Sequence, residues 1–216
     1  MKKGFTPAEL LIALAIVGAI SVMTIPTLVS NYRAHVASVR LKKFYSNMRT
    51  AIQISEIKNC RAINWDKEDR VYNENGSNNM EENNKNAAAF FDRYLAPYFK
   101  YKTKTLQDKS YQYYLPDGSS FKFWNFNCID IYYDINGNDN KPNKMGADVF
   151  DFLNCLDDDM RNAYFGNKLD IFNTYGTGLV KTRKDALKQC KQAPEYCSTL
   201  LMYDGWKLKK DYPYNP

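Results

Sequence analysis

The chain has 216 residues, which suffices for one domain with appended segments or for two small domains. Aromatic residues make up 15% of it, so we expect a packed core and little disorder. The formal net charge is +6, and acidic and basic residues alternate along most of the chain, which argues against a dedicated nucleic-acid-binding face. The sequence also lacks a glycine-rich phosphate loop, a nucleophile elbow and a zinc signature.

The N-terminal segment is long and apolar enough to cross a membrane. From Leu10 to Val29, twenty residues carry no charge, and a helix of this length covers the roughly 30 Å of a bilayer's hydrocarbon core. Glu9 lies immediately before this run. Because a carboxylate is costly at membrane depth, an acid in this place is a candidate functional residue whose partner must be found.

Ordinary export signals account for this segment incompletely. A secretory signal peptide has a shorter apolar core followed by an A-x-A-like cleavage site, and no convincing site follows Val29. A lipoprotein signal needs a cysteine near the end of the apolar run, whereas the first cysteine is Cys60. A plain signal anchor fits the length of the run but leaves Glu9 unexplained.

The residues before the apolar run resemble a known processing site. Glu9 follows the segment Lys2-Lys3-Gly4-Phe5 at a distance of four residues from Phe5. This arrangement is similar to the cleavage and methylation site of type IV prepilins and type II secretion pseudopilins. The resemblance implies that the prepilin peptidase cleaves between Gly4 and Phe5 and that Phe5 is N-methylated. It also implies that Glu9 serves subunit assembly by pairing with the N-terminus of a neighbouring subunit.

The same resemblance implies an organisation and a function. Residues 1–4 form a leader peptide, residues 5–57 a hydrophobic to amphipathic helix, and residues 58–216 a C-terminal globular α+β domain. The protein is then a structural subunit and not an enzyme, inserted once in the inner membrane with its N-terminus inside. It self-associates on an inner-membrane assembly platform into a helical filament, periplasmic or extracellular, of the type IV pilus or type II secretion pseudopilus kind.

The N-terminal pattern leaves an alternative open. Pro7 and Ala8 stand where the family commonly has aliphatic residues, although proline is tolerated in the first helical turn because its missing N–H would have no partner there. Basic residues follow the apolar run as well as precede it, so charge alone does not orient the anchor. The alternative is a signal-anchored exported enzyme or ligand-binding domain in which Glu9 is incidental.

The N-terminal helix is expected to continue into the domain. Pro26 should kink it or unwind it locally, because proline removes a backbone donor and clashes with the preceding turn. Beyond Pro26, apolar residues recur with helical spacing and predict a face laid against the globular domain. This apolar stripe consists of Leu41, Phe44, Tyr45, Met48 and Ile52. The only histidine, His35, lies on the same helix, and we expect it to be solvated or to face another subunit.

A loop and a short helix are predicted next. Residues 58–86 are polar and asparagine-rich, which predicts a surface loop. Residues 87–101 predict a short amphipathic helix that ends near Pro97.

The central part of the chain predicts an antiparallel sheet. The runs YQYYL (111–115) and FKFW (121–124) flank a Pro-Asp-Gly turn, which is a hairpin pattern, and CIDIYYDI (128–135) predicts a third strand. The expected fold is therefore α+β, with a long N-terminal helix packed on an antiparallel sheet. The first half of the helix spans the membrane, as in pilins. The order of the strands is not predictable from these patterns.

The stretch DINGNDNKPNKMGADVF, residues 134–150, is rich in oxygen-bearing side chains. Asp134, Asn136 and Asn138 occupy alternate positions, as do the first three ligands of a calcium loop, and Asp148 is placed to close the site. It is not an EF-hand, because the twelfth position is Met145 instead of a glutamate. Some secretion pseudopilins resemble this arrangement, with a calcium loop after their sheet. Asparagine, glycine, aspartate and proline also form ordinary turns, so calcium binding and a bare loop stay open as alternatives.

Five cysteines without a C-x-x-C pair, and with one histidine, make a zinc site a poor interpretation. Behind a membrane anchor they suggest an oxidising compartment, with disulfides and one thiol left over. We expect a bond between Cys190 and Cys197, with two buried free thiols as the alternative. The pairing of the other three stays open; they are Cys60, Cys128 and Cys155.

The acidic run Asp157-Asp158-Asp159 does not predict a catalytic pair. Three adjacent acids point in different directions on any regular element, so we expect a solvated helix start. The C-terminal segment predicts a basic helix, the short cysteine loop and a second apolar turn or helix.

Overall fold

One long helix and one antiparallel sheet organise the molecule. The computed structural model describes residue 4 and residues 6–214. Its α-helices are α1 (Pro7–Asn59), α2 (Met80–Tyr94), α3 (Asp158–Phe165), α4 (Arg183–Gln192) and α5 (Cys197–Tyr203). Short 3₁₀ turns lie at Ala62–Asn64, Ala96–Tyr98, Thr177–Leu179 and Pro194–Tyr196. The strands are β1 (Thr103–Gln107), β2 (Ser110–Tyr114), β3 (Ser120–Asn125), β4 (Ile129–Asp134), β5 (Val149–Asn154) and β6 (Phe172–Thr174).

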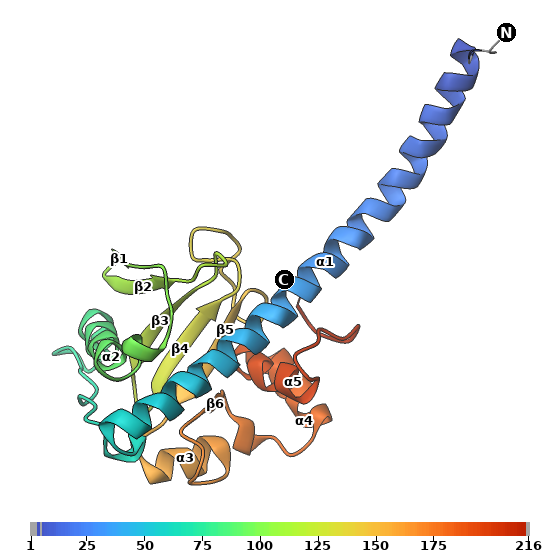
Figure 1. Cartoon of the computed structure of the whole chain (residues 1–216). Helices are drawn as coiled ribbons and strands as arrows, with labels where there is room; N and C mark the ends of the chain where they lie inside the picture. Colours follow the sequence, from blue (N-terminus) through green and yellow to red (C-terminus); the bar gives the residue numbers. More distant parts are fainter. Residues whose placement is uncertain (1–3, 5, 215–216) are drawn as a thin grey trace.

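Helix α1 has two halves in different surroundings. Its first half projects away from the rest of the molecule, and its second half crosses the sheet (Figure 1). The helix does not unwind at Pro26, so of the two predicted effects the local unwinding is wrong. A single proline removes one hydrogen bond from a helix of 53 residues, and the intact turns on either side keep the chain helical.

The apolar stripe of α1 forms the centre of the core, as predicted from its spacing. Leu41, Phe44, Met48 and Ile52 are buried, and Tyr45 is partly buried against them. The ring of Phe44 stacks on that of Tyr133 in β4, with centroids 4.1 Å apart. Burying these side chains stabilises the fold by roughly 1.5–3 kcal/mol each.

The sheet is a meander in which each strand pairs with its neighbour in sequence, in the order β1-β2-β3-β4-β5-β6, and all pairs are antiparallel. The predicted hairpin is formed by β2 and β3, with Tyr113 opposite Phe121. Phe121 lies opposite Tyr133, and Tyr133 lies opposite Phe150, so this row faces α1. Helix α2 covers the same face, where Phe91 contacts Phe121 at 5.5 Å between ring centroids. The expected α+β fold, a long helix on an antiparallel sheet, is confirmed.

The sequence misplaced the start of α2. This helix begins at Met80, whereas residues 80–86 were expected to belong to a surface loop. The side chain of Asn79 accepts a hydrogen bond from the backbone N–H of Glu82 (3.0 Å) and caps the helix. Asn84, in the second turn, is fully buried and donates to the carbonyl of Phe123 in β3 (2.8 Å). The asparagines here fix the helix to the sheet, which overrides their preference for loops.

Two disulfides lie in the second half of the chain. The structure joins Cys190 to Cys197, the pair expected from the sequence, and so links the last turns of α4 to the start of α5. It also joins Cys128 to Cys155, which flank the paired ends of β4 and β5. Cys60, just after α1, is exposed and free. The pairing that the sequence left open is therefore settled by the register of the sheet.

Candidate functional site

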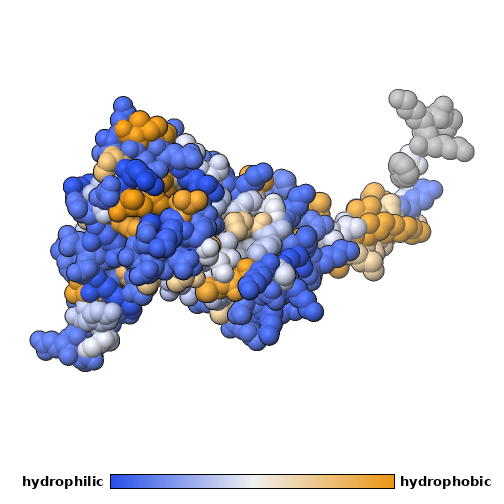
Figure 2. Space-filling view, turned by 90° about the horizontal axis from the view of Figure 1, so that it is seen from below, coloured by the Kyte–Doolittle hydropathy of each residue, from blue (hydrophilic) through white to orange (hydrophobic). Residues whose placement is uncertain are grey.

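The projecting half of α1 exposes a continuous apolar surface. The most apolar stretch of this helix, 18 residues long, is 0% buried. In the described part of the chain, α1 is the one helix that is long and apolar enough to cross a membrane. Large aliphatic side chains are exposed all round it; Leu11 (68%), Val22 (75%) and Leu28 (70%) are examples. Figure 2 shows this half as a hydrophobic extension of the molecule. A surface of this kind requires a lipid or protein cover.

Glu9 closes the first turn of α1 through Thr6. Its carboxylate Oε2 accepts from the backbone N–H of Thr6 (2.8 Å) and from the Thr6 hydroxyl (2.9 Å). The Thr6 hydroxyl accepts in return from the backbone N–H of Glu9 (3.3 Å), which completes a capping box. Sequence reasoning missed Thr6, although the T-x-x-E spacing is visible. Gly4 is exposed, and Phe5 lies outside the described residues.

Three of the four candidate calcium ligands converge in the loop after β4. Asp134 Oδ1 accepts from the backbone N–H groups of Asn136 (3.1 Å) and Gly137 (3.0 Å). The side-chain amide of Asn136 donates to Asp148 Oδ2 (3.2 Å). Asn138 instead turns its side chain towards Gln107 of β1 (3.1 Å). Of the four expected ligands, the structure brings together Asp134, Asn136 and Asp148, and the Asn138 side chain lies apart from them.

Two side-chain oxygen atoms in this loop have no hydrogen-bond partner among the described residues. They are Asn136 Oδ1 and Asn143 Oδ1, and both are buried. Burial, together with the charge of Asp148, raises the pKa of Asp134 to about 7, against the backbone hydrogen bonds from Asn136 and Gly137. Carboxylate and amide oxygens are the kinds of donor that a hard cation prefers, so the chemistry of the side chains in this loop is compatible with calcium. The described residues contain no group of three or more carboxylate, histidine or cysteine side chains that could together hold a metal ion.

Gly137 gives this loop its shape. Its φ is +87°, and a Cβ there would lie 2.4 Å from the carbonyl oxygen of Gly118 in the β2–β3 turn. Only glycine fits this close approach of two backbones. The oxygen-rich loop is therefore held against the hairpin turn.

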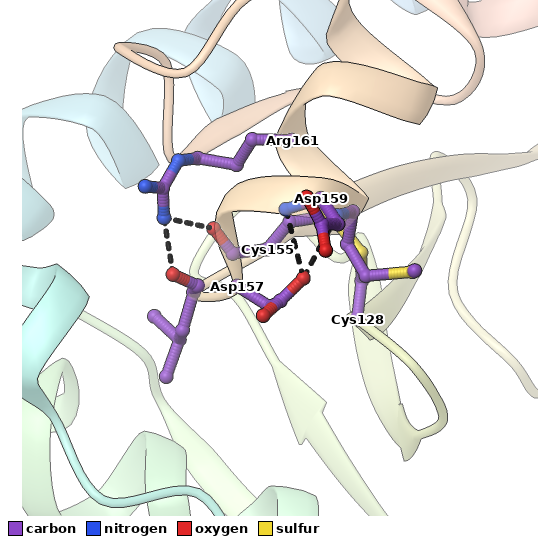
Figure 3. The surroundings of a disulfide bond; sticks show 7 residues. Cys128, Cys155, Asp157, Asp159 and Arg161 are labelled. Carbon is purple, nitrogen blue, oxygen red and sulfur yellow. Dashed lines mark hydrogen bonds between the residues drawn. A yellow bond between two sulfur atoms is a disulfide. The ribbon is translucent and has the colours of Figure 1, made fainter.

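The acidic run Asp157–Asp159 forms the start of α3, as expected, and has a structural role there. Asp157 caps α3 by accepting from the backbone N–H groups of Asp159 and Met160 (2.9 Å each). Arg161 is 1% exposed and donates to the carbonyl oxygens of Cys155 and Leu156 (Figure 3). Its guanidinium therefore fixes the start of the helix beside the Cys128–Cys155 bond.

Sequence reasoning missed a pair of acids on the far face of the sheet, of which Asp151 is buried and Asp130 is partly buried. Asp130 lies opposite Leu153 and Asp151 opposite Tyr132, so the two carboxylates are diagonal neighbours on the face away from α1. Asp151 is 1% exposed, and its Oδ1 has no partner among the described residues. Burial raises the pKa of Asp130 to about 7, against the opposing charge of Arg70. Burial, and then the charge of Asp130, raise the pKa of Asp151 well above its usual value.

The sequence predicts which face of the sheet Asp130 and Asp151 occupy, but it does not predict that this face is covered. Asp130 and Asp151 each occupy one position of an alternating strand pattern, where a polar residue normally faces solvent. Helix α3 and the segment around Tyr175 cover this face, and no local pattern indicates that cover.

Comparison with known proteins places the chain in one family. Residues 27–215 match a family of unknown function (DUF6613), and the chain belongs to this family. The match contains the second half of α1 and the domain, and it begins after Gly4 and Glu9. No curated protein and no solved structure matches the chain.

Proposed function

We propose that this protein is a structural subunit of a type IV pilus-like or type II secretion pseudopilus filament, processed by the prepilin peptidase at Gly4-Phe5. The observation that carries the proposal is the exposed apolar half of α1, continuous with a second half built into the domain core. The first half requires cover all round, which a bilayer supplies before assembly and neighbouring copies of the helix supply in a filament.

The position of Glu9 supports the same function. Its carboxylate is directed at the backbone N–H of Thr6, the residue that follows Phe5. Cleavage after Gly4 would create a cationic amine within one residue of this contact. The capping box therefore holds the acid close to where the new N-terminus forms, on the helix face that a neighbouring subunit approaches.

The oxygen-rich loop adds a cation to the proposal. Asp134 and Asp148 supply charge, and the unpartnered oxygens of Asn136 and Asn143 supply neutral donors. Calcium bound there would neutralise the two carboxylates and fix the loop against the β2–β3 turn, so its role is structural.

The decisive experiment is N-terminal sequencing and intact-mass measurement of the protein extracted from its native membrane. We expect a chain that begins at a methylated Phe5. A chain that begins at Met1, or one cut after Val29, would contradict the proposal and favour a signal-anchored exported enzyme or binding domain.

Matched glycine variants sharpen this test. Gly4→Leu should leave full-length precursor in the membrane and abolish filaments, because the peptidase must accommodate a small residue before the cut. Gly18→Leu is the control: Gly18 has no neighbouring atom within 4 Å of an added Cβ, so processing should be normal. Normal processing of the Gly4 variant would remove the cleavage assignment.

A further inference from the structure

A groove lies where α1 enters the domain. It has a volume of about 590 Å³ and is formed by one face of α1 and by the loop after β4. Its apolar lining includes Tyr32, Val36 and Pro142, and its basic lining is Arg33, Arg40 and Lys141. Among the described residues, no acidic side chain lines it.

The three basic residues of the groove differ in whether their side chains make hydrogen bonds within the fold. Arg40 donates to the backbone carbonyls of Ile135 and Asp117, so its guanidinium is occupied within the fold. Arg33 and Lys141 are exposed, and their side chains have no hydrogen bond or ion pair within the described chain. Two cationic groups therefore face the groove without an internal counter-charge.

Two acids that contact residues of the groove, Asp117 and Asp148, have other partners. Asp117 accepts from Ser119 and pairs with Lys43 (3.5 Å). Asp148 accepts from the backbone N–H groups of Asn143 (2.9 Å) and Lys144 (2.6 Å). Neither carboxylate pairs with Arg33 or Lys141, so both cationic groups are available to an anion from outside the chain.

The depth of the groove indicates where that charge lies. Arg33 is four residues beyond Val29, the last residue of the uncharged run, which places it roughly 6 Å past the hydrocarbon core if α1 runs close to the membrane normal. The polar layer of a bilayer is about 5–8 Å thick on each side. Tyr32 lies at the boundary, where tyrosine is favoured. The groove thus opens at the level of the lipid headgroups.

We infer that this groove binds the headgroup of an anionic phospholipid from the leaflet that α1 leaves. Arg33 and Lys141 contact the phosphate, and Tyr32, Val36 and Pro142 cover the glycerol and the first methylene groups. The inference rests on the part of the proposed function in which α1 spans a membrane. A bound headgroup would fix the rotation of the domain about α1 against the membrane surface.

The test uses the full chain, delipidated in detergent, with native mass spectrometry to measure binding of added phosphatidylglycerol and phosphatidylcholine. We expect preferential binding of phosphatidylglycerol. The double variant Arg33→Gln/Lys141→Gln should weaken that binding roughly 25-fold, since each basic side chain near an anionic surface contributes about a factor of five.

The control variant is Lys100→Gln/Lys102→Gln, which removes the same two charges from exposed positions before β1. It should leave lipid binding unchanged. Equal affinity for the two lipids, an equal loss in the control variant, or displacement of phosphatidylglycerol by an equal concentration of inorganic phosphate would each overturn the inference. N-terminal sequencing tests the processing proposal separately, because an unprocessed chain that still spans the membrane retains this groove.

Discussion

Glu9 and Thr6 bond to one another in both directions at the start of α1, so Glu9 contributes to the helix even in a single chain. A capping residue contributes about 1 kcal/mol to helix stability. The proposed intermolecular role of Glu9 depends on its charge, whereas the capping role depends only on an acceptor oxygen. The two roles are therefore separable by substitution.

Glu9→Gln should keep the capping box, because glutamine also accepts at this position, and should remove the charge needed to pair with a neighbouring N-terminus. We expect membrane insertion to be unchanged and filament yield, measured by electron microscopy of sheared fractions, to fall at least tenfold. Thr6→Ala should have the opposite profile, with a frayed first turn and near-normal filaments. Filaments lost in Thr6→Ala and retained in Glu9→Gln would assign Glu9 to the cap alone.

The carboxylates of the partly buried Asp130 and the buried Asp151 should make stability depend on pH. Their pKa values in the folded state are raised, to about 7 for Asp130, whereas an unfolded aspartate has a pKa of about 4. The folded protein therefore binds protons more tightly, and its stability falls as the pH rises from about 4 through about 7. Urea unfolding of the full chain in detergent measures this fall.

Asp151→Asn should flatten that pH dependence and raise the urea midpoint at pH 8, because it removes a charge that has no hydrogen-bond partner for Oδ1 in the described chain. Glu74→Gln is the control, since Glu74 is exposed in the loop before α2. A midpoint that is higher at pH 8 than at pH 5 in the unmodified protein would contradict the prediction.

At the scale of elements, the two disulfides close loops of different length. Cys128 and Cys155 are 27 residues apart and Cys190 and Cys197 are 7 apart. In the chain-entropy account, the longer loop contributes about 3.5 kcal/mol and the shorter one about 2.5 kcal/mol. Replacing Cys128 and Cys155 together by serine should therefore lower the unfolding free energy more than replacing Cys190 and Cys197.

Thiol labelling of the native, non-reduced protein should modify Cys60 alone. Rapid labelling of four further thiols would contradict both bonds.

The oxygen-rich loop should respond to calcium as a unit. At a calcium concentration one hundred times its Kd, binding to the folded state adds about 2.7 kcal/mol, which raises the Tm of a chain of this size by about 5–10 °C. Asp134→Ala should abolish the increment. Asn138→Ala should retain it, because the Asn138 side chain bonds to Gln107 and not to the carboxylates. Magnesium should substitute poorly for calcium. A Tm that changes neither with added calcium nor with a chelator would show that the loop is an ordinary turn without a bound cation.

The elements that could be predicted are those whose sequence pattern lies within a few neighbouring residues. The stripe from Leu41 to Ile52 and the β2–β3 hairpin have a regular period or a turn sequence within a few residues, and both were predicted. Strand β1 has the sequence TKTLQ and lies at the sheet edge, so polar residues suffice and no alternation is visible. Strand β5 carries the buried Asp151, and β6 has only three residues. Their strand character comes from their partners in the sheet.

The candidate site divides in the same way. Gly4 and Glu9 were selected by their resemblance to a prepilin processing site, and the four loop residues were selected by their spacing; each group lies within a short stretch of sequence. The direction of the Asn138 side chain depends on Gln107, thirty-one residues earlier, and the headgroup groove joins Arg33 to Lys141 across the fold. Contacts over such distances require the register of the sheet and the path of α1, which local patterns do not contain.

At the scale of the whole molecule, the domain does not depend on the projecting half of α1. No described residue before Ala37 is buried. A chain that begins at Ser30 should therefore be monomeric in water, with an unfolding free energy within about 0.5 kcal/mol of that of the full chain in detergent. Size-exclusion chromatography and urea unfolding measure both quantities. Aggregation, or a clearly lower unfolding free energy, would show that the first half supports the domain.

The continuity of α1 also determines how the molecule carries tension. The helix is about 80 Å long, and no loop separates its projecting half from the residues buried in the domain core. In the proposed filament, a pull along its axis would therefore reach the core through the helical hydrogen bonds of α1, one turn after another. The turn at Pro26 lacks one of these bonds, because proline has no N–H to offer the carbonyl of Val22. Extension under load is expected to begin there, so that the helix lengthens near Pro26 before the domain gives way.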